Sequence, residues 1–227
     1  MNEKQFIEEL KIDYDSEKMN KLKKYYEILI EKNKVMNLTA ITELEEVYLK
    51  HFYDSLTITK IIDLNKFETF CDIGTGAGFP GVVIKIFYPH LKVTLIESLS
   101  KRVDFLNYLI KELDLKDIKV INTRAEDYAR KNRELFDVVT ARAVANINIL
   151  LEYSIPLVKV NKYFIAMKGK KEEISSSALK LLDISIDDIS SFNLLNGNER
   201  TLYLFKKNQK TSIKYPRKYN EIKKKNL

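Results

Sequence analysis

A glycine-rich loop follows a short apolar run in the first half of the chain. Its glycines recur at alternate positions within the segment FCDIGTGAGFPG, namely Gly74, Gly76 and Gly78. Glycine tolerates a positive φ and lets a ligand approach the backbone closely, and the helix expected after the loop begins with N–H groups that lack partners inside the helix. Dinucleotide sites carry a third glycine where this chain has Phe79. The spacing therefore favours a cofactor with an adenosine and no diphosphate, commonly S-adenosylmethionine, over an ordinary tight turn.

Glu97 is a candidate ligand for the hydroxyl groups of a ribose. It ends the apolar run Val93–Glu97, 23 residues after Gly74, which is close to the ~20 residues expected for a carboxylate that reaches a bound ribose. A carboxylate can accept hydrogen bonds from both hydroxyls of a diol. The alternative is an acidic residue that stabilises the start of the next helix, and the two roles are compatible.

Charged residues also follow the later strand-like runs, at Glu126, Arg142 and Lys168. In an open α/β sheet, ligands bind outside the carboxyl ends of the strands, so these residues should meet at the rim that carries the glycine loop. Glu126 or Asp127 could accept a hydrogen bond from an adenine amino group, although a helix cap is an equal alternative for Glu126. Arg142 leaves an apolar strand, where a charge needs an anion or a carboxylate. The same argument applies more weakly to Lys168, because lysine is abundant in this chain.

Short β-rich runs alternate with helical stretches from Phe67 onward, which predicts an α/β fold with a mostly parallel sheet and helices on both faces. A hairpin-type turn at Asn196-Gly197 predicts two further strands, and the last strand should be antiparallel. The seven predicted strands are Thr69–Ile73, Lys92–Glu97, Ile118–Asn122, Phe136–Ala141, Tyr163–Met167, Ser191–Leu195 and Thr201–Phe205. The stretches between them are predicted as helices at Gly81–Tyr88, Ser100–Leu113 and Asn146–Val158 and as an acidic-capped turn at Glu126–Arg133.

The chain before this alternation reads as helical. Apolar residues recur at steps of three and four in Lys18–Lys34, and Thr42 followed by Glu45 predicts a capping box that opens a second helical segment. We therefore expect three parts: an N-terminal helical segment at 1–62, a cofactor-binding domain at 63–206 and a C-terminal tail at 207–227.

The composition excludes several classes of protein. The single cysteine, Cys71, rules out an internal disulfide, and the two histidines, His51 and His90, lie far apart, so no metal site is expected. The start of the chain has no basic region followed by an apolar one, so no secretory signal is expected. No run of 18 apolar residues is found, so no membrane span is expected either. A cytoplasmic protein with a sizeable core is the resulting expectation.

The net charge of +7 is concentrated at the C-terminus. Residues 206–227 hold nine basic residues and one acidic residue, so the rest of the chain is close to neutral. Tyrosines at 203, 215 and 219 lie among these cations, a composition suited to stacking on unpaired bases. The alternative is a solvated, disordered terminus.

These motifs together resemble the bacterial small-subunit ribosomal RNA (guanine-N7)-methyltransferase G family, also called glucose-inhibited division protein B. The resemblance runs from about residue 25 to residue 218 and rests on several stretches. They are NLTAI at 37–41, HFYDSL at 51–56, the loop at 72–81, SLSKR at 98–102, RAE at 124–126, FDVVTARA at 136–143 and YPRK at 215–218.

The resemblance implies a Rossmann-like class I methyltransferase that transfers a methyl group from S-adenosylmethionine to N7 of a guanine in a conserved loop of 16S rRNA. It implies a monomer whose partner is that RNA or the small ribosomal subunit. The residues implied at the cofactor are Gly74, Gly76, Gly78, Phe79, Glu97, Ala125, Glu126 and Arg142. The residues expected at the RNA are Lys168, Lys214, Arg217 and Lys218.

The residue types agree with that chemistry. Guanine N7 is a lone-pair acceptor on the base edge, so it needs no general base and no covalent nucleophile. Cys71 lies inside a strand, and no Asp/Asn-Pro-Pro-aromatic element follows the fourth strand, which argues against methylation of pyrimidine C5 or of exocyclic amines. We expect Arg142 to be the catalytic residue, at the junction of cofactor and guanine. His51 is either a packing residue or a ligand contact.

Two alternatives remain open at this point. One is a nucleic-acid-binding module whose glycine loop has lost its ligand, and the other is a small-molecule methyltransferase. Binding of S-adenosylmethionine separates the first from an enzyme, and the basic tail argues mildly against the second. A nicotinamide oxidoreductase is disfavoured by Phe79.

Overall fold

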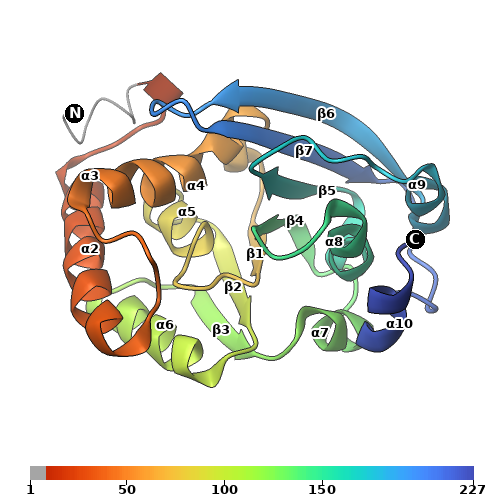
Figure 1. Cartoon of the computed structure of the whole chain (residues 1–227), viewed down its shortest axis with the longest axis horizontal. Coiled ribbons are helices and arrows are strands. Elements are labelled where there is room, and N and C mark those ends of the chain that lie inside the picture. Colours follow the sequence, from red (N-terminus) through yellow and green to blue (C-terminus); the bar gives the residue numbers. More distant parts are fainter. Residues whose placement is uncertain (1–8) are drawn as a thin grey trace.

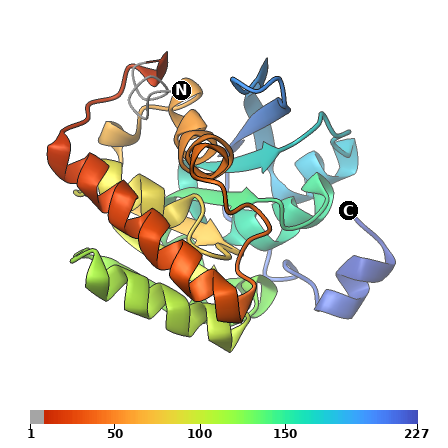
Figure 2. The ribbon, with the colours of Figure 1, turned by 60° about the vertical axis from the view of Figure 1, so that its left-hand side comes forward.

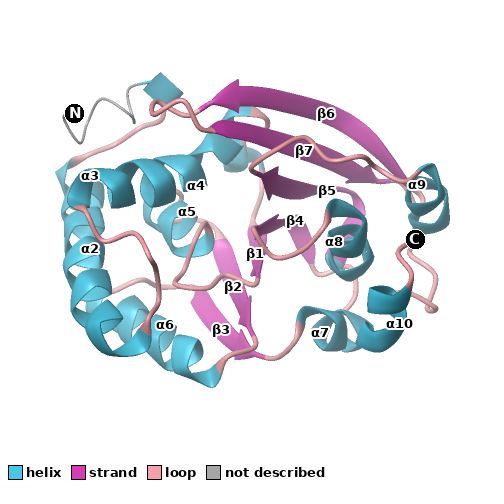
Figure 3. Ribbon diagram, viewed as in Figure 1, coloured by secondary structure: helices cyan, strands magenta, loops and turns pink. Residues whose placement is uncertain are grey.

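Seven strands form one twisted sheet in the order β3-β2-β1-β4-β5-β7-β6, as Figure 1 and Figure 3 show. The structure is a computed structural model that describes residues 9–227. Strands β3, β2, β1, β4 and β5 pair in parallel, and β7 is antiparallel to β5 and β6. The strands are β1 (Thr69–Ile73), β2 (Lys92–Glu97), β3 (Ile118–Asn122), β4 (Phe136–Arg142), β5 (Val158–Lys168), β6 (Ile184–Asn193) and β7 (Glu199–Lys207). The predicted seven-stranded, mostly parallel sheet is confirmed.

Helices cover both faces of this sheet and enclose two hydrophobic cores. One core includes Leu29, Phe52 and Val83 from the helices that precede β2, and Figure 2 shows the long α2 lying alongside α6 on this face. The other core includes Leu151 and Ile222 from the later helices. The α-helices are α2 (Ser16–Met36), α3 (Leu44–Val47), α4 (Asp54–Leu56), α5 (Gly81–Phe87), α6 (Ser100–Glu112), α7 (Ala125–Lys131), α8 (Ile147–Ser154), α9 (Ser176–Leu182) and α10 (Tyr219–Lys224). A π-helical turn, η1 (Tyr48–Tyr53), and three short 3-10 turns, η2 (Thr57–Lys60), η3 (Leu64–Lys66) and η4 (Ile155–Leu157), complete the helical elements.

The N-terminal helices pack into the first of these cores. Helix α2 begins after the capping residue Asp15 and ends at Met36, and the next residue, Asn37, terminates it in the left-handed conformation with a φ of 50°. The predicted capping box at Thr42 is wrong, because α3 begins only at Leu44 and its N-cap residue Glu43 makes no side-chain capping bond. Thr42 lies outside the N-cap position from which a hydroxyl reaches the first helical N–H groups. The first eight residues, which bear on the expected absence of a targeting segment, lie outside the described residues.

One edge of the sheet differs from the prediction. Strand β6 covers Ile184–Asn193 rather than the predicted Ser191–Leu195, and α9 before it has no predicted counterpart. Strand β6 is an edge strand whose middle is exposed and carries Asp187 and Asp188. Charged residues are typical of edge strands because they discourage pairing with another chain, and here they hide the apolar pattern. The predicted turn at Asn196-Gly197 is confirmed, with Gly197 at a φ of 82°.

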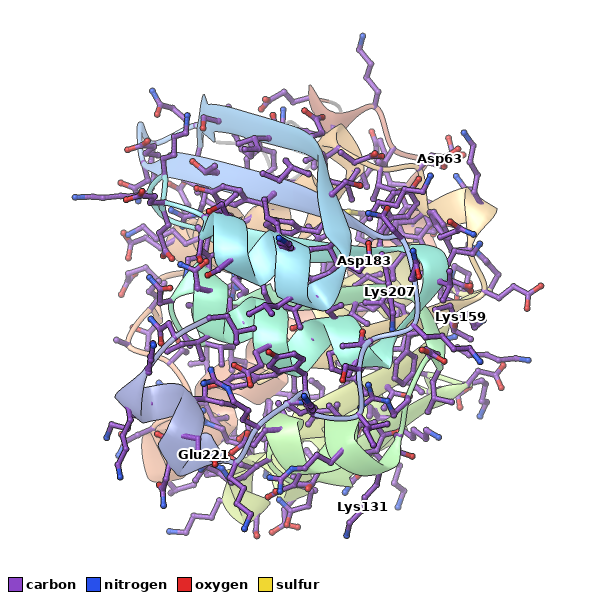
Figure 4. All side chains as sticks on the ribbon, turned by 90° about the vertical axis from the view of Figure 1, so that its right-hand side faces the viewer. Asp63, Lys131, Lys159, Asp183, Lys207 and Glu221 are labelled. Atoms are coloured by element: carbon purple, nitrogen blue, oxygen red, sulfur yellow. The ribbon has the colours of Figure 1, made fainter. Side chains whose placement is uncertain are left out.

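The C-terminal tail begins one residue later than predicted and docks on the second core. Lys207 is the last residue of β7 and is fully buried, and its Nζ donates to the carbonyl oxygens of Ile155 and Val158 at 3.0 and 2.9 Å. Burial lowers the pKa of this lysine to about 8. Figure 4 shows Lys207 where the tail begins and Glu221 on the terminal helix α10. Figure 1 places α10 beside α7, close to α8.

Gly81 lets α5 pack directly against the sheet. Its N–H donates to Asp72 Oδ2 at 2.8 Å, and a Cβ at this position would lie 2.3 Å from Leu95 Cδ2. We expect Gly81→Ala to lower the free energy of unfolding by about 1–3 kcal/mol, as over-packing of a core does, measured by urea denaturation. Gly169→Ala is the matched control because no atom lies within 4 Å of its added Cβ. Equal stabilities of the two variants would contradict this prediction.

Candidate active site

The glycine loop connects the end of β1 to α5 and is held by the end of β2. The N–H of Gly74 donates to the carbonyl oxygen of Ile96 at 2.8 Å, and the N–H of Gly76 donates to Glu97 Oε2 at 3.1 Å. Gly74 and Gly76 adopt φ values of 65° and 62°, a left-handed conformation that glycine adopts without steric cost. The alternate glycines therefore fold the loop back on the neighbouring strand end.

Glu97 anchors this loop with a buried carboxylate. Its side chain is 4% exposed; Oε1 accepts a hydrogen bond from the N–H of Leu99 at 2.9 Å, and Oε2 accepts the one from Gly76. A carboxylate offers about four lone-pair sites, so two hydrogen bonds leave capacity for the hydroxyls of a ribose. The position of Glu97 is compatible with its predicted role.

A cavity of about 340 Å³ opens beside the loop at the carboxyl ends of the parallel strands. Of the predicted cofactor residues, Gly74, Ala125 and Glu126 line it directly. The lining combines the buried carboxylate of Glu126 with the apolar side chains of Ile73, Ile96 and Ile149, and this combination fits a cofactor that contains adenosine. We call it the cofactor cavity.

The other predicted cofactor residues, Gly76, Gly78, Phe79, Glu97 and Arg142, do not line this cavity. Gly76 and Glu97 form the loop and its anchor. Gly78 and Phe79 face the N-terminal helices, because a Cβ on Gly78 would lie 2.6 Å from the hydroxyl oxygen of Tyr25, and the rings of Tyr25 and Phe79 stack with centroids 5.2 Å apart.

Arg142 lies at a second cavity of about 400 Å³. The charged and polar residues that line this second cavity come from η1, α4, the ends of β4 and β5, the segment that follows β5, and β7. They are Lys50, His51, Asp54, Arg142, Lys168, Glu172 and Arg200. The cavity combines hydrogen-bond donors and acceptors with an apolar wall, and we call it the acceptor cavity.

Asp54 joins two arginines at the acceptor cavity. Its carboxylate is 3% exposed; Arg142 Nη1 donates to Oδ2 at 3.0 Å and Arg200 Nε donates to Oδ1 at 2.9 Å. Arg142 Nη1 also donates to the carbonyl oxygen of Lys50 at 3.1 Å, and the guanidinium carbon lies 5.3 Å from the centroid of the Phe79 ring. These contacts fix the direction of Arg142, whose side chain remains 15% exposed.

His51 is held in one tautomer between Arg142 and Thr39. Arg142 Nη2 lies 3.4 Å from His51 Nδ1, and an arginine can only donate, so Nδ1 is the acceptor. Nε2 therefore carries the proton and donates to Thr39 Oγ1 at 2.9 Å. The imidazole stacks on Phe79 with centroids 4.5 Å apart. His51 thus positions Arg142, and it also lines the acceptor cavity.

We expect the pH dependence of stability to report the burial of His51. Burial and the nearby Arg142 lower the pKa of His51 to about 3, whereas a histidine in the unfolded chain titrates near 6.5. Between these values the unfolded state binds more protons, so stability is fully present above pH 6.5 and falls below it by up to about 1.4 kcal/mol per pH unit. His51→Gln should flatten the change measured by urea denaturation at pH 7 and pH 5.5. His90→Gln, at an exposed position, is the control, and an unchanged slope in His51→Gln would contradict the prediction.

A short segment after β4 separates the two cavities. Ala143 lines the acceptor cavity, and the next two residues, Val144 and Ala145, line the cofactor cavity. Lys168 Nζ donates to the carbonyl oxygen of Ala145 and pairs with Glu172 at 2.7 Å, and Glu172 Oε2 accepts from the N–H at the start of α8 at 2.7 Å. Lys168, which the sequence assigned to RNA, therefore holds this separating segment in place.

The three tail residues expected at the RNA differ in their surroundings. Lys214 and Lys218 are exposed. The guanidinium of Arg217 forms a two-point ion pair with the fully buried Glu152, at 2.8 and 2.7 Å. Arg217 thus docks the tail on α8, and its charge is not available to a phosphate in the way the sequence suggested.

Sequence reasoning missed Asp54, Arg200, Glu152 and Lys223 as residues of the site, and it considered Tyr219 only for stacking on unpaired bases. Asp54 belongs to the HFYDSL stretch, but nothing near it in the sequence indicates its partners. Arg200 contacts Asp54 across 146 positions of the chain, and no local pattern reveals such a contact.

Neither a metal site nor a membrane span is found in the part of the chain that the structure describes. Within residues 9–227, no three His, Cys, Asp or Glu residues are grouped in a way that could hold a metal ion. No helix in that range combines the length and the apolar character needed to cross a bilayer.

The chain is similar to known proteins over most of its length. The family model described as GidB, rRNA small subunit methyltransferase G, matches residues 18–203. A Ribosomal RNA small subunit methyltransferase G from Lysinibacillus sphaericus (strain C3-41) is 47% identical and covers 96% of both chains. A protein of the same name from Bacillus thuringiensis (strain Al Hakam) is also 47% identical and covers 96% of this chain and 95% of the relative.

Two solved structures share the fold at low sequence identity. A SAM dependent methyltransferase from Aquifex aeolicus has a TM-score of 0.52 at 18% identity and covers 72% of this chain and 93% of that one. The structure of MtNAS in complex with MTA and tNA has a TM-score of 0.56 at 16% identity and covers 83% of this chain and 74% of that one. The predicted Rossmann-like fold is thereby confirmed.

Proposed function

This chain belongs to the rRNA small subunit methyltransferase G family, and from that premise we propose that it methylates N7 of a guanine in 16S rRNA with S-adenosylmethionine as cofactor. The observation that carries the proposal is the pair of cavities divided by Ala143 and Val144 at the end of β4. A cofactor on one side and a base on the other would meet at this division, where Arg142 is held.

The residues at the cofactor cavity are suited to different parts of S-adenosylmethionine. S-adenosylmethionine, when bound, supplies an electrophilic methyl group on a sulfonium centre. Glu97 is suited to the ribose hydroxyls because its buried carboxylate retains free lone pairs. Glu126 lines the cavity and is suited to an adenine amino group. Gly74 and Gly76 let the ligand approach the loop backbone.

The acceptor cavity positions a base without deprotonating it. Guanine N7 carries a lone pair in the plane of the base, and Arg142 can donate to O6, the acceptor next to N7. Asp54 offsets the positive charge of Arg142 and Arg200 in a site where the base gains positive charge on methylation. Positioning of this kind is worth up to roughly 7–11 kcal/mol of the barrier in well-oriented reactions. Guanine N7 is itself the nucleophile, so the protein needs to supply neither a covalent nucleophile nor a general base. Cys71 is buried within β1, and burial raises the pKa of its thiol.

The tail is the proposed RNA contact. Lys214 and Lys218 present exposed charges to phosphates, while Lys168 and Arg217 act indirectly, by positioning the separating segment and the tail. Both cavities are lined by residues of one chain, which supports a monomer as the active form. An rRNA substrate supports a cytoplasmic location.

Mass mapping of 16S rRNA from cells with and without the gene tests the proposed function. We expect one guanine to carry a methyl group at N7 in the presence of the gene and to lack it in its absence. A plasmid copy should restore the modification, and a copy with Arg142→Gln should not. An identical methylation map in both strains would contradict the proposal.

A further inference from the structure

The C-terminal helix contributes residues to the cofactor cavity. Tyr219 and Lys223, one helical turn apart on α10, line the same cavity as Gly74 and Glu126. Figure 1 shows α10 beside α7, the helix that begins with Ala125 and Glu126. The tail therefore reaches the site where the cofactor is expected to bind, although it lies far from the glycine loop in the sequence.

This placement is held by specific contacts of the tail. Arg217 forms its two-point ion pair with the fully buried Glu152, and Ile222 on α10 is 1% exposed within the second core. Arg133 donates to the carbonyl oxygens of Thr211 and Tyr215 at 2.7 and 2.8 Å. An ion pair, an apolar anchor and two backbone contacts thus fix the position of α10.

Arg124 connects the ring of Tyr219 to the proposed adenine-binding carboxylate. The guanidinium carbon of Arg124 lies 4.1 Å from the centroid of the Tyr219 ring. Its Nε also pairs with Glu126 Oε1, a carboxylate that is 3% exposed. Tyr219 is 38% exposed, so its ring lies between the solvent and the cavity. Such stacked cation–ring pairs stabilise both partners.

We propose that α10 forms the outer wall of the cofactor cavity and that Tyr219 contributes to cofactor affinity. The inference rests on the proposed function for the identity of the cofactor. The tail that ends in this helix also holds the exposed Lys214 and Lys218, so one segment contacts the cofactor and offers charge to the RNA. If cofactor binding stabilises the docked tail, it raises the affinity for the RNA. RNA binding then raises the affinity for the cofactor by the same factor.

Isothermal titration of the full-length protein with S-adenosylhomocysteine, without RNA, tests the wall directly. We expect Tyr219→Ala to weaken binding by about tenfold, since loss of the aromatic side chain exposes the adenine of the ligand to water. Tyr219→Phe keeps the ring and should bind within about twofold of the wild type. Lys224→Ala is the matched control, because it removes a charge from the same helix without changing the cavity lining.

The possible outcomes distinguish a failure of the proposal about α10 from a failure of the proposed function. Equal affinities of Tyr219→Ala and the wild type would overturn the proposal that α10 forms a wall of the cofactor cavity. A loss of similar size in Tyr219→Phe or Lys224→Ala would also overturn it, since the effect would then belong to the tail as a whole. Failure of the wild-type protein to bind S-adenosylhomocysteine would instead overturn the proposed function. Lys223→Ala gives a second variant, with an expected severalfold loss, if Tyr219→Ala does not fold.

Discussion

Replacing Arg142 with glutamine should lower the rate of methyl transfer by about 100-fold or more while the protein still folds. Arg142 is directed into the acceptor cavity by Asp54 and by the carbonyl oxygen of Lys50, and loss of one pre-positioned donor typically lowers kcat by about 10²–10³. Asp54 keeps its ion pair with Arg200, so no buried charge is left without a partner. Single-turnover transfer of a labelled methyl group to small-subunit rRNA measures the effect.

A matched control distinguishes the loss of Arg142 at the acceptor cavity from the loss of one positive charge elsewhere on the protein. Arg130→Gln removes an arginine from α7 that pairs with the half-exposed Asp127, and it should leave the rate unchanged. Thermal melting of Arg142→Gln checks that the fold persists. A folded Arg142→Gln protein with full activity would show that Arg142 has no part in the reaction.

Replacing Glu97 with alanine should weaken cofactor binding by about 100-fold. The carboxylate accepts hydrogen bonds from two backbone N–H groups that shape the loop, those of Gly76 and Leu99, and it is the proposed ligand of the ribose. Hydrogen bonds to a charged group are worth about 1.5–3 kcal/mol each, and each 1.4 kcal/mol corresponds to tenfold in affinity. Calorimetric titration with S-adenosylhomocysteine provides the measurement.

Two further variants show how Glu97 acts. Glu97→Gln keeps the volume and one acceptor oxygen, and we expect it to bind between the wild type and Glu97→Ala. Asp104→Asn, an exposed position on α6, should bind as the wild type does. Wild-type affinity in Glu97→Ala would contradict both proposed roles of Glu97, the contact with the ribose and the anchoring of the loop.

The sheet could be predicted because its signals are local. Each parallel strand contains a short β-rich run that a polar turn follows, and the observed β1, β2 and β3 have the predicted limits. Strand β5 begins at Val158, five residues before its predicted start, because Lys159, Asn161 and Lys162 interrupt the apolar pattern there. The loop glycines were also recognisable in the sequence, since the positive φ values that they adopt favour glycine. Only the end of edge strand β6 was predicted, because the exposed acidic residues in its first half break the apolar alternation.

The acceptor cavity could be predicted only in part, because ion pairs between distant elements leave no pattern in one sequence. Arg142 was identified as a charge that needs a partner, and the partner proved to be Asp54, 88 positions away. Lys168 and Arg217 were assigned to RNA from charge alone, whereas their carboxylate partners Glu172 and Glu152 appear only in the folded chain. The same holds for Tyr219, which reaches the cofactor cavity only because the tail docks.

The identity of the methylated atom tests the account most directly. Purified protein is incubated with small-subunit rRNA and labelled S-adenosylmethionine, and the RNA is digested to nucleosides for mass spectrometry. We expect the label in 7-methylguanosine, in an amount that depends on Arg142. Label on an exocyclic amine or on pyrimidine C5, or no transfer by a protein that binds the cofactor, would contradict the account.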